Sequence, residues 1–216
     1  MIDGRRPLSM AEKAFLKAMK PLATFSEGFW IDFGEEIVRA HGISGFFKWA
    51  KITGDIQAEL QAEVGVMHNH LLSAFSSLLN GCDYCGFGNL LAFNMHWLKE
   101  RGELFPIPEF DGLRLLKFSY EELYDEVAKL LEGEQYEHER RLVLRQMDLK
   151  LGRVQVETDE DRVLQRSLHL YDFINECSIV VDAPAPPLGH ISKEKGLLQK
   201  YREMRPLPER FTQSDT

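Results

Sequence analysis

Apolar residues recur at steps of three and four in the first half of the chain, which is the period of an α-helix with one buried face. The pattern covers residues 55–79 and, after a short polar stretch, residues 82–101, and it predicts two helices that form a hairpin at the centre of the core. Asn80-Gly81 ends the first helix, because this dipeptide readily adopts the left-handed backbone found at helix ends. The apolar positions of the first helix are Ile56, Leu60, Val64, Met67, Leu71, Phe75 and Leu78.

Two capping boxes near the N-terminus predict further helices, since a serine or threonine there precedes a glutamate by three positions. The helices are expected to begin at Ser9 and at Thr24. The first is expected to stop at Pro21, because proline lacks the donor that a helix interior needs, and the second near Gly42. Asp55 is expected to cap the long helix that leads to the cysteines.

The second half of the chain also has the pattern of helices. A third capping box opens a helix at Ser119 that is expected to run to Gly133. The charged run over residues 134–150 has apolar residues at helical spacing and predicts an amphipathic helix. A last long helix is expected to begin at Asp159 or Asp161. The expected fold class is therefore all-α, a helical bundle.

The proline content divides the chain into two unequal parts. Residues 1–182 are expected to form one helical domain, and residues 183–216 a proline-rich linker followed by a C-terminal arm. The linker is expected to be stiff, because proline fixes its own backbone angle and cannot continue a helix. The arm is too short to fold alone, so we expect it to pack on a neighbouring subunit or to stay loose.

Charge and composition exclude several classes of partner. The chain has 216 residues, a formal charge of −8 and 44% hydrophobic residues, which suits one globular domain. The acidic balance argues against nucleic acid and anionic membranes, because both bind clustered lysine and arginine. No run of eighteen apolar residues and no signal-peptide core is present, so we expect no membrane span and a cytoplasmic location.

Two of the three cysteines, Cys82 and Cys85, are expected at the start of the second hairpin helix. Exposed N–H groups and peptide dipoles at a helix N-terminus favour thiolate over thiol. The spacing allows a disulfide or a shared soft metal such as zinc. No second Cys-x-x-Cys or His-x-x-x-His pair is present, so redox use is favoured and neither a metal nor another cofactor is expected. The alternative is simple apolar packing, which is also the expected role of Cys177.

The cysteine segment resembles the active-site segment of the AhpD-like alkylhydroperoxidase and carboxymuconolactone decarboxylase superfamily, on the run Asn80-Gly81-Cys82-Asp83-Tyr84-Cys85. The resemblance covers about residues 55–100 and implies an AhpD-like helical fold. The family pattern is Glu, eleven residues, Cys-x-x-Cys, three residues and His. By this resemblance Cys85 attacks the peroxide, Cys82 resolves the product to a disulfide, and the Glu and His carry the proton.

The chain differs from the family pattern at both proton-relay positions. The residue twelve positions before Cys82 is His70 where the family has Glu, and the residue four positions after Cys85 is Asn89 where the family has His. A histidine can serve as acid or base near neutral pH. We therefore take Cys85, Cys82, His70 and Asn89 as the candidate catalytic residues.

A hairpin about the turn would set His70 opposite residue 93, with Asn89 and His96 each about one turn away. Asn89 can hold the imidazole ring but cannot carry a proton. His96 shares the helical face of Cys85, yet it lies about 16 Å further along the helix axis. It is expected to act only through an intermediary.

The leading functional hypothesis is a thiol-dependent hydroperoxide reductase, with a hydroperoxide as substrate and an external dithiol as reductant. The altered relay leaves a second hypothesis, a redox-responsive structural or binding protein with little or no peroxidase turnover. A decarboxylase or lactone-handling enzyme fits less well, because that branch of the superfamily generally lacks the cysteine pair. The resemblance also implies a homo-oligomer, a trimer or hexamer. The C-terminal arm and the aromatic-rich residues 46–49, which also suit a core, are candidate contacts.

Overall fold

A computed structural model describes residues 6–27, 30–180 and 194–208. Within these ranges the regular structure is helical, no strand is present, and no helix combines the length and apolarity needed to cross a membrane. The predicted all-α fold class is therefore confirmed. The helices are α1 (Met10–Glu27), α2 (Gly34–Leu79), α3 (Asp83–Arg101), α4 (Glu109–Leu115), α5 (Tyr120–Leu130), the 3-10 turn η1 (Glu134–Tyr136), α6 (Glu137–Lys150), α7 (Asp159–Val180) and α8 (Lys195–Met204).

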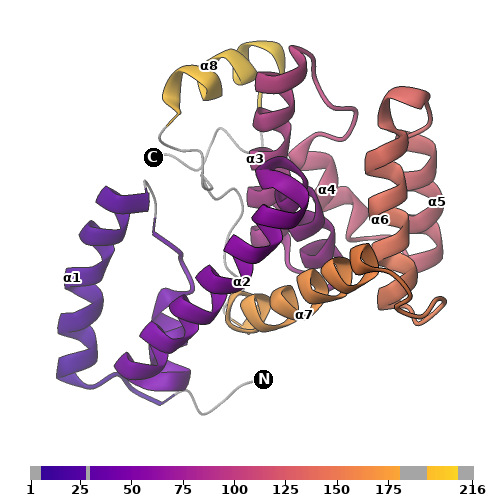
Figure 1. The fold of residues 1–216 in the computed structure, drawn as a ribbon. Coiled ribbons are helices and arrows are strands. Elements are labelled where there is room, and N and C mark those ends of the chain that lie inside the picture. Colours follow the sequence, from indigo (N-terminus) through magenta and orange to yellow (C-terminus); the bar gives the residue numbers. More distant parts are fainter. Residues whose placement is uncertain (1–5, 28–29, 181–193, 209–216) are drawn as a thin grey trace.

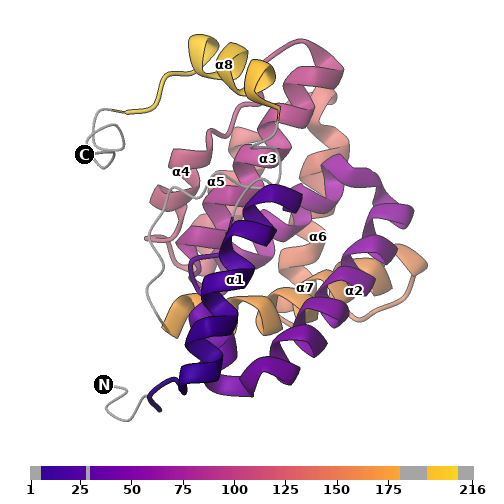
Figure 2. The same ribbon diagram turned by 90° about the vertical axis from the view of Figure 1, so that its left-hand side faces the viewer.

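Helices α2 and α3 form the middle of the molecule (Figure 1). Helix α1 lies to one side against the first part of α2, whereas α5 and α6 pack together on the opposite side. Figures 1 and 2 both show α7 running across the lower part of the molecule and α8 lying along its top. Since α7 packs on α2 and α6, it brings a late part of the chain to the junction of α2 and α3.

The largest core lies between the second half of α2, α3 and helices α4 to α7. Phe93, Trp97 and Phe105 pack there with ring centroids 4.7 to 5.9 Å apart. Burial of such large apolar side chains is the main stabilising contribution to a helical bundle. The predicted apolar face of α2 is buried in this core at Met67, Leu71, Phe75 and Leu78.

The turn between α2 and α3 has the geometry that the sequence predicts. Gly81 has φ of 76°, in the left-handed region, and the N–H of Cys82 donates to the Ser77 carbonyl at 2.9 Å. Cys82 is the N-cap residue of α3, and Gly102, also at φ of 76°, ends that helix. The predicted position of Cys82 and Cys85 at a helix N-terminus is therefore confirmed.

Gly81→Ala is expected to lower the free energy of unfolding by about 1 kcal/mol, because a Cβ atom disfavours the left-handed region. Nothing lies within 4 Å of the position that this Cβ would occupy, so the cost is conformational rather than steric. The matched control is Gly54→Ala inside α2, where the space is equally open and the change should stabilise the protein by about 0.5 kcal/mol. Chemical denaturation measures both values. Equal changes in the free energy of unfolding of the two variants would refute the assignment of strain to Gly81.

Three predicted helix boundaries near the N-terminus are wrong. Helix α1 continues through Pro21, which lies on its exposed surface, where water can bond to the carbonyl that the proline leaves unpaired. Thr24 therefore lies inside α1, and its hydroxyl donates to a backbone carbonyl one turn earlier. The predicted helix end near Gly42 is present as a break within α2: Gly42 has non-helical backbone angles, with φ of 71° and ψ of 179°, and Gly65 interrupts the helix again. Asp55 lies within α2 and pairs with a lysine instead of capping a helix.

The second half of the chain follows the prediction more closely. The capping box at Ser119 is present: its hydroxyl accepts from the Glu122 N–H at 3.3 Å, and the Glu122 carboxylate accepts from the Ser119 N–H at 2.8 Å. Helix α7 begins at Asp159, one of the two predicted starts. Helix α4 was not predicted, because seven residues are too few to establish a periodic pattern.

The aromatic residues 46–49 divide between core and surface. Phe46 and Trp49 are buried, and Trp49 stacks on Phe173 of α7 with a centroid distance of 6.1 Å. Phe47 is 54% exposed and packs its edge against Phe15 of α1. Two of the three aromatic side chains therefore belong to the core of this chain.

The described part of the C-terminal arm packs on its own chain. Tyr201 of α8 is fully buried against α3 beside Phe87 and Leu91. Arg202 forms an ion pair with the buried carboxylate of Glu109 at the start of α4. The prediction of a loose arm or one packed only on a neighbouring subunit is thus wrong for α8, because sequence periodicity did not reveal this buried carboxylate partner. The proline-rich linker at residues 182–189 lies outside the described residues.

Candidate active site

The sulfur of Cys82 is surrounded by hydrogen-bond donors. The backbone N–H of Cys85 donates to Cys82 Sγ at 3.5 Å, and Ser178 Oγ lies 3.1 Å from the same sulfur. Cys82 and Cys85 are both free cysteines and lie 3.4 Å apart. The Cys82 sulfur can therefore accept from a backbone amide, from a hydroxyl and from the neighbouring thiol.

These contacts give the two cysteines opposite tendencies to ionise. The Cys85 thiol, donating to Cys82, lowers the pKa of Cys82, and the Ser178 hydroxyl lowers it further, although burial acts in the opposite direction. The pKa of Cys85 lies well above its ordinary value, because its proton is held by Cys82 and because the side chain is buried. The thiolate of the pair is therefore expected on Cys82, whereas the family resemblance implied that Cys85 is the nucleophile.

Ser178 belongs to α7 and is 2% exposed. Its Oγ lies 3.6 Å from Cys85 Sγ and donates to the Asn175 carbonyl at 3.1 Å. The side-chain oxygen of Asn175 lies 3.4 Å from the hydroxyl of Ser77 on α2, which also donates to the Ser73 carbonyl at 2.8 Å. The polar contact between α7 and α2 thus holds the serine beside the cysteine turn.

His70 and Asn89, the two residues at the relay positions, lie in contact. His70 Nδ1 is 3.1 Å from Asn89 Oδ1. The amide nitrogen of Asn89 donates to the Cys85 carbonyl at 3.0 Å, so its oxygen faces the imidazole and His70 Nδ1 is the donor in this pairing. Both side chains are buried. The structure therefore joins His70 to the first turn of α3 through Asn89.

Asn89 also contacts Tyr171, which in turn contacts Gln57. The hydroxyl of Tyr171 donates to Asn89 Oδ1 at 3.5 Å and accepts from Gln57 Nε2 at 3.0 Å. Burial raises the pKa of Tyr171, so this phenol is a neutral donor. The Asn89 oxygen thus accepts from the imidazole on one side and from the phenol on the other. Gln57, Tyr171 and Asn89 come from α2, α7 and α3, so the network depends on the packing of three helices.

His96 stacks on His70, with ring centroids 5.6 Å apart and an interplanar angle of 18°. His96 is half-buried, and burial lowers its pKa below the ordinary histidine value. The imidazole is therefore neutral at pH 7. The sequence predicted only indirect action of His96, and in the structure it reaches the Asn89 network through His70.

All three cysteines are buried, at 2% exposure for Cys82, 7% for Cys85 and 5% for Cys177. Burial raises the pKa of Cys177 to about 11, and the carboxylates of Glu176 and Glu36 contribute to the increase. Cys177 is therefore a thiol rather than a thiolate at neutral pH, in agreement with its expected structural role. Access to Cys82 and Cys85 requires local movement of the surrounding helices.

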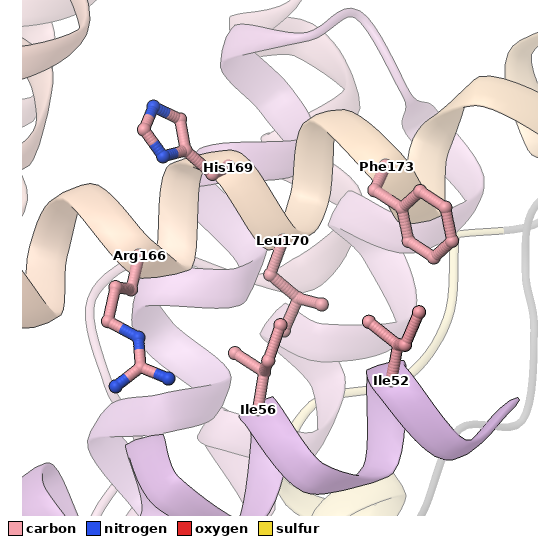
Figure 3. Close-up of a pocket in the computed structure, with 6 residues that line it drawn as sticks. All are labelled: Ile52, Ile56, Arg166, His169, Leu170 and Phe173. Carbon is pink, nitrogen blue, oxygen red and sulfur yellow. The ribbon is translucent and has the colours of Figure 1, made fainter. Parts of the chain in front are cut away.

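A surface pocket of about 260 Å³ lies between α2 and α7 (Figure 3). Figure 3 shows Ile56 and Leu170 pointing towards each other across it, whereas His169 points away from α2. Arg166 forms an ion pair with Glu59, so its charge is already balanced. The residues that line the pocket are Ile52, Ile56, Arg166, His169, Leu170 and Phe173, none of which belongs to the cysteine site.

No arrangement in the described ranges brings three or more histidine, cysteine, aspartate or glutamate side chains together as a metal site. Comparison of the chain with known protein families, curated proteins and solved structures gave no match. The geometry around the cysteines and the resemblance of the cysteine segment are therefore the indications of function.

Sequence reasoning missed Ser178, Tyr171 and Gln57. The first two lie on the predicted last long helix, and their only signal is a polar group on its apolar face. That signal shows that a partner is needed when such a group is buried, but it does not show which partner. Gln57 follows Ile56 on α2 and had no signal, because an exposed glutamine on a helix is ordinary.

Proposed function

We propose that the protein is a thiol-dependent hydroperoxide reductase of the AhpD-like type that cycles Cys82 and Cys85 between dithiol and disulfide. The observation that carries the proposal is the pair of free cysteines, 3.4 Å apart at the start of α3, with pKa values displaced in opposite directions. Disulfide chemistry needs one thiolate that attacks and one thiol that resolves the product.

The proposed cycle begins with attack of the Cys82 thiolate on the terminal oxygen of a hydroperoxide. The O–O bond breaks, Cys82 becomes a sulfenic acid, and the alkoxide takes up a proton and leaves as an alcohol. The Cys85 thiol then condenses with the sulfenic acid, which forms the disulfide and releases water. An external dithiol reduces this disulfide, is itself oxidised to a disulfide, and restores both thiols.

His70 is the proposed proton donor to the leaving alkoxide. Its imidazole is held by Asn89, and Asn89 is held by the Cys85 carbonyl and by Tyr171. An oriented imidazole can act as a general acid and regain its proton within one cycle. Asn89 acts as a positioning residue in this proposal, because an amide cannot carry the proton.

We also propose that the protein is cytoplasmic and that it forms a homo-oligomer, a trimer or hexamer. A reducing compartment suits a protein whose cysteines must return to thiols. Exposed apolar side chains support self-association, because large apolar groups at a surface favour contact with another subunit. They include Leu22 and Phe25 on α1 and Phe47 on α2, at 57%, 87% and 54% exposure.

The test is a count of free thiols in the reduced protein before and after excess hydrogen peroxide, and again after dithiothreitol. The wild type is expected to lose two thiols and regain both, and peptide mapping should place the disulfide between Cys82 and Cys85. Cys177→Ser is the matched control and should lose the same two thiols. The double variant Cys82→Ser/Cys85→Ser should lose none at a comparable rate. Thiols that stay reduced in the wild type would refute the proposal.

The burial of both sulfurs favours a second candidate function, a redox-responsive structural or binding protein with little turnover. Oxidation at 2% and 7% exposure needs a local opening of the fold, which limits how often the cycle can repeat. The two candidates differ in the presence of excess peroxide and dithiol. A peroxidase consumes many equivalents of peroxide per protein, whereas a redox-responsive protein, limited by the slow opening around its buried sulfurs, consumes about one equivalent in the same time.

A further inference from the structure

The Ser178 hydroxyl has one proton and two acceptors at the same distance, and the Cys85 sulfur, at 3.6 Å, is farther away. Its Oγ lies 3.1 Å from the Asn175 carbonyl oxygen and 3.1 Å from Cys82 Sγ. A hydroxyl can donate to one of these acceptors at a time. We propose that Ser178 is a further catalytic residue, whose hydroxyl turns its proton from the Asn175 carbonyl to the Cys82 sulfur when that thiol ionises. The inference rests on the proposed function, because it assigns a role within the same dithiol cycle.

Rotation of the Ser178 hydroxyl from one acceptor to the other breaks no covalent bond. The proton lost from Cys82 goes to solvent, and Ser178 keeps its own proton while changing acceptor. The backbone N–H and the thiol of Cys85 donate from α3, so Ser178 adds a donor from α7. Once the disulfide has formed, Cys82 carries no charge and the Asn175 carbonyl is again the better acceptor. The hydroxyl therefore stabilises the reactive charged state more than the neutral states before and after it.

Other titratable groups face the pair from α3 and α7. Asp83, next to Cys82, opposes ionisation of both cysteines because it is itself negative. The phenols of Tyr84 and Tyr171 lie close enough to interact with the cysteines, and burial keeps both neutral at pH 7. Burial also opposes the thiolate. The donors to Cys82 must offset Asp83 and burial together, which makes the loss of any one donor measurable.

The experiment measures the rate at which iodoacetamide alkylates Cys82 as a function of pH, with the labelled residue identified by mass spectrometry. In Ser178→Ala the rate at pH 7 is expected to fall about tenfold, because one hydrogen bond to a charged sulfur is lost. At a pH high enough to ionise the thiol fully, the rate should match that of the wild type. Ser167→Ala is the matched control, since Ser167 is a fully buried serine of the same helix that contacts Ser76 instead. It should change the rate less than twofold.

A pH profile of Ser178→Ala that coincides with the wild-type profile would overturn the inference. If the alanine variant does not fold, the isosteric pair Ser178→Thr and Ser178→Val replaces it, and only the variant with a hydroxyl should keep the wild-type profile. Equal profiles for threonine and valine would also overturn the inference. Alkylation reports ionisation whether or not a disulfide forms. Suppose that alkylation of Cys82 is slower in Ser178→Ala and that peroxide does not oxidise the wild type. This result would refute the proposed function and would still support the role of Ser178 in thiolate formation.

Discussion

Cys82→Ser is expected to abolish disulfide formation and to slow the reaction of the remaining thiol with hydroperoxide by roughly 100-fold. The reason is that the variant lacks Cys82, the thiol whose neighbours favour ionisation, whereas the remaining Cys85 thiol is buried and burial opposes its ionisation. Stopped-flow mixing with hydrogen peroxide, followed by trapping of sulfenic acid with dimedone, measures the loss.

Cys85→Ser is the matched variant, because a serine at this position keeps a donor directed at Cys82. It should react with peroxide at nearly the wild-type rate and accumulate a sulfenic acid on Cys82, since no thiol remains to condense with it. The reverse pattern, with sulfenic acid trapped on Cys85 in the Cys82→Ser variant, would contradict this assignment. It would support the order of attack that the family resemblance implies.

Asp161→Asn is expected to lower the free energy of unfolding by about 2 kcal/mol, because it weakens several charge-assisted hydrogen bonds. The buried Asp161 carboxylate accepts from Arg145 Nε at 2.7 Å and Nη2 at 3.0 Å. It also accepts from the backbone N–H groups of Glu157 and Thr158, each at 3.0 Å. These bonds fasten the start of α7 to α6. Asp159→Asn is the matched control, since that side chain is 91% exposed and should change stability by less than about 0.5 kcal/mol.

The contribution of Asp161 to the free energy of unfolding should decrease as the pH falls. The Arg145 guanidinium and the backbone donors hold the pKa of Asp161 well below its ordinary value. Its stabilisation is therefore complete above the unfolded-state pKa of about 3.9, and it is lost as the pH falls below that value towards the folded-state pKa. The difference in stability between wild type and Asp161→Asn, measured by denaturation from pH 7 to pH 2, should shrink below about pH 4. A difference that does not change with pH would show that the charge is not responsible.

Local chemistry is enough to predict the region that carries the cysteines. Asn80-Gly81 requires a left-handed residue at the turn, and Gly81 adopts it. Helical periodicity on both sides then places Cys82 and Cys85 at the start of α3. The same geometry brings His70 near Asn89, because the two lie at similar distances from the turn along neighbouring helices.

Helix boundaries near the N-terminus were harder to predict, because local signals there are overridden by packing and solvent. Pro21 and Asp55 both have sequence preferences for a helix boundary. In the structure α1 passes through Pro21 at the surface, and Asp55 lies within α2. On either side of Asp55, Trp49 and Leu60 are buried in one cluster, and that tertiary contact outweighs the local preference.

The all-α class, the turn at Asn80-Gly81 and the placement of two cysteines at a helix N-terminus follow from local sequence, because each depends on residues within a few turns of one another. Which cysteine is expected to ionise depends instead on tertiary packing. The Ser178 hydroxyl comes from α7, 96 residues after Cys82, and it lies against the sulfur because α7 packs across α2. A hydrogen bond between such distant residues depends on how whole helices pack, so periodicity and local propensity cannot predict it.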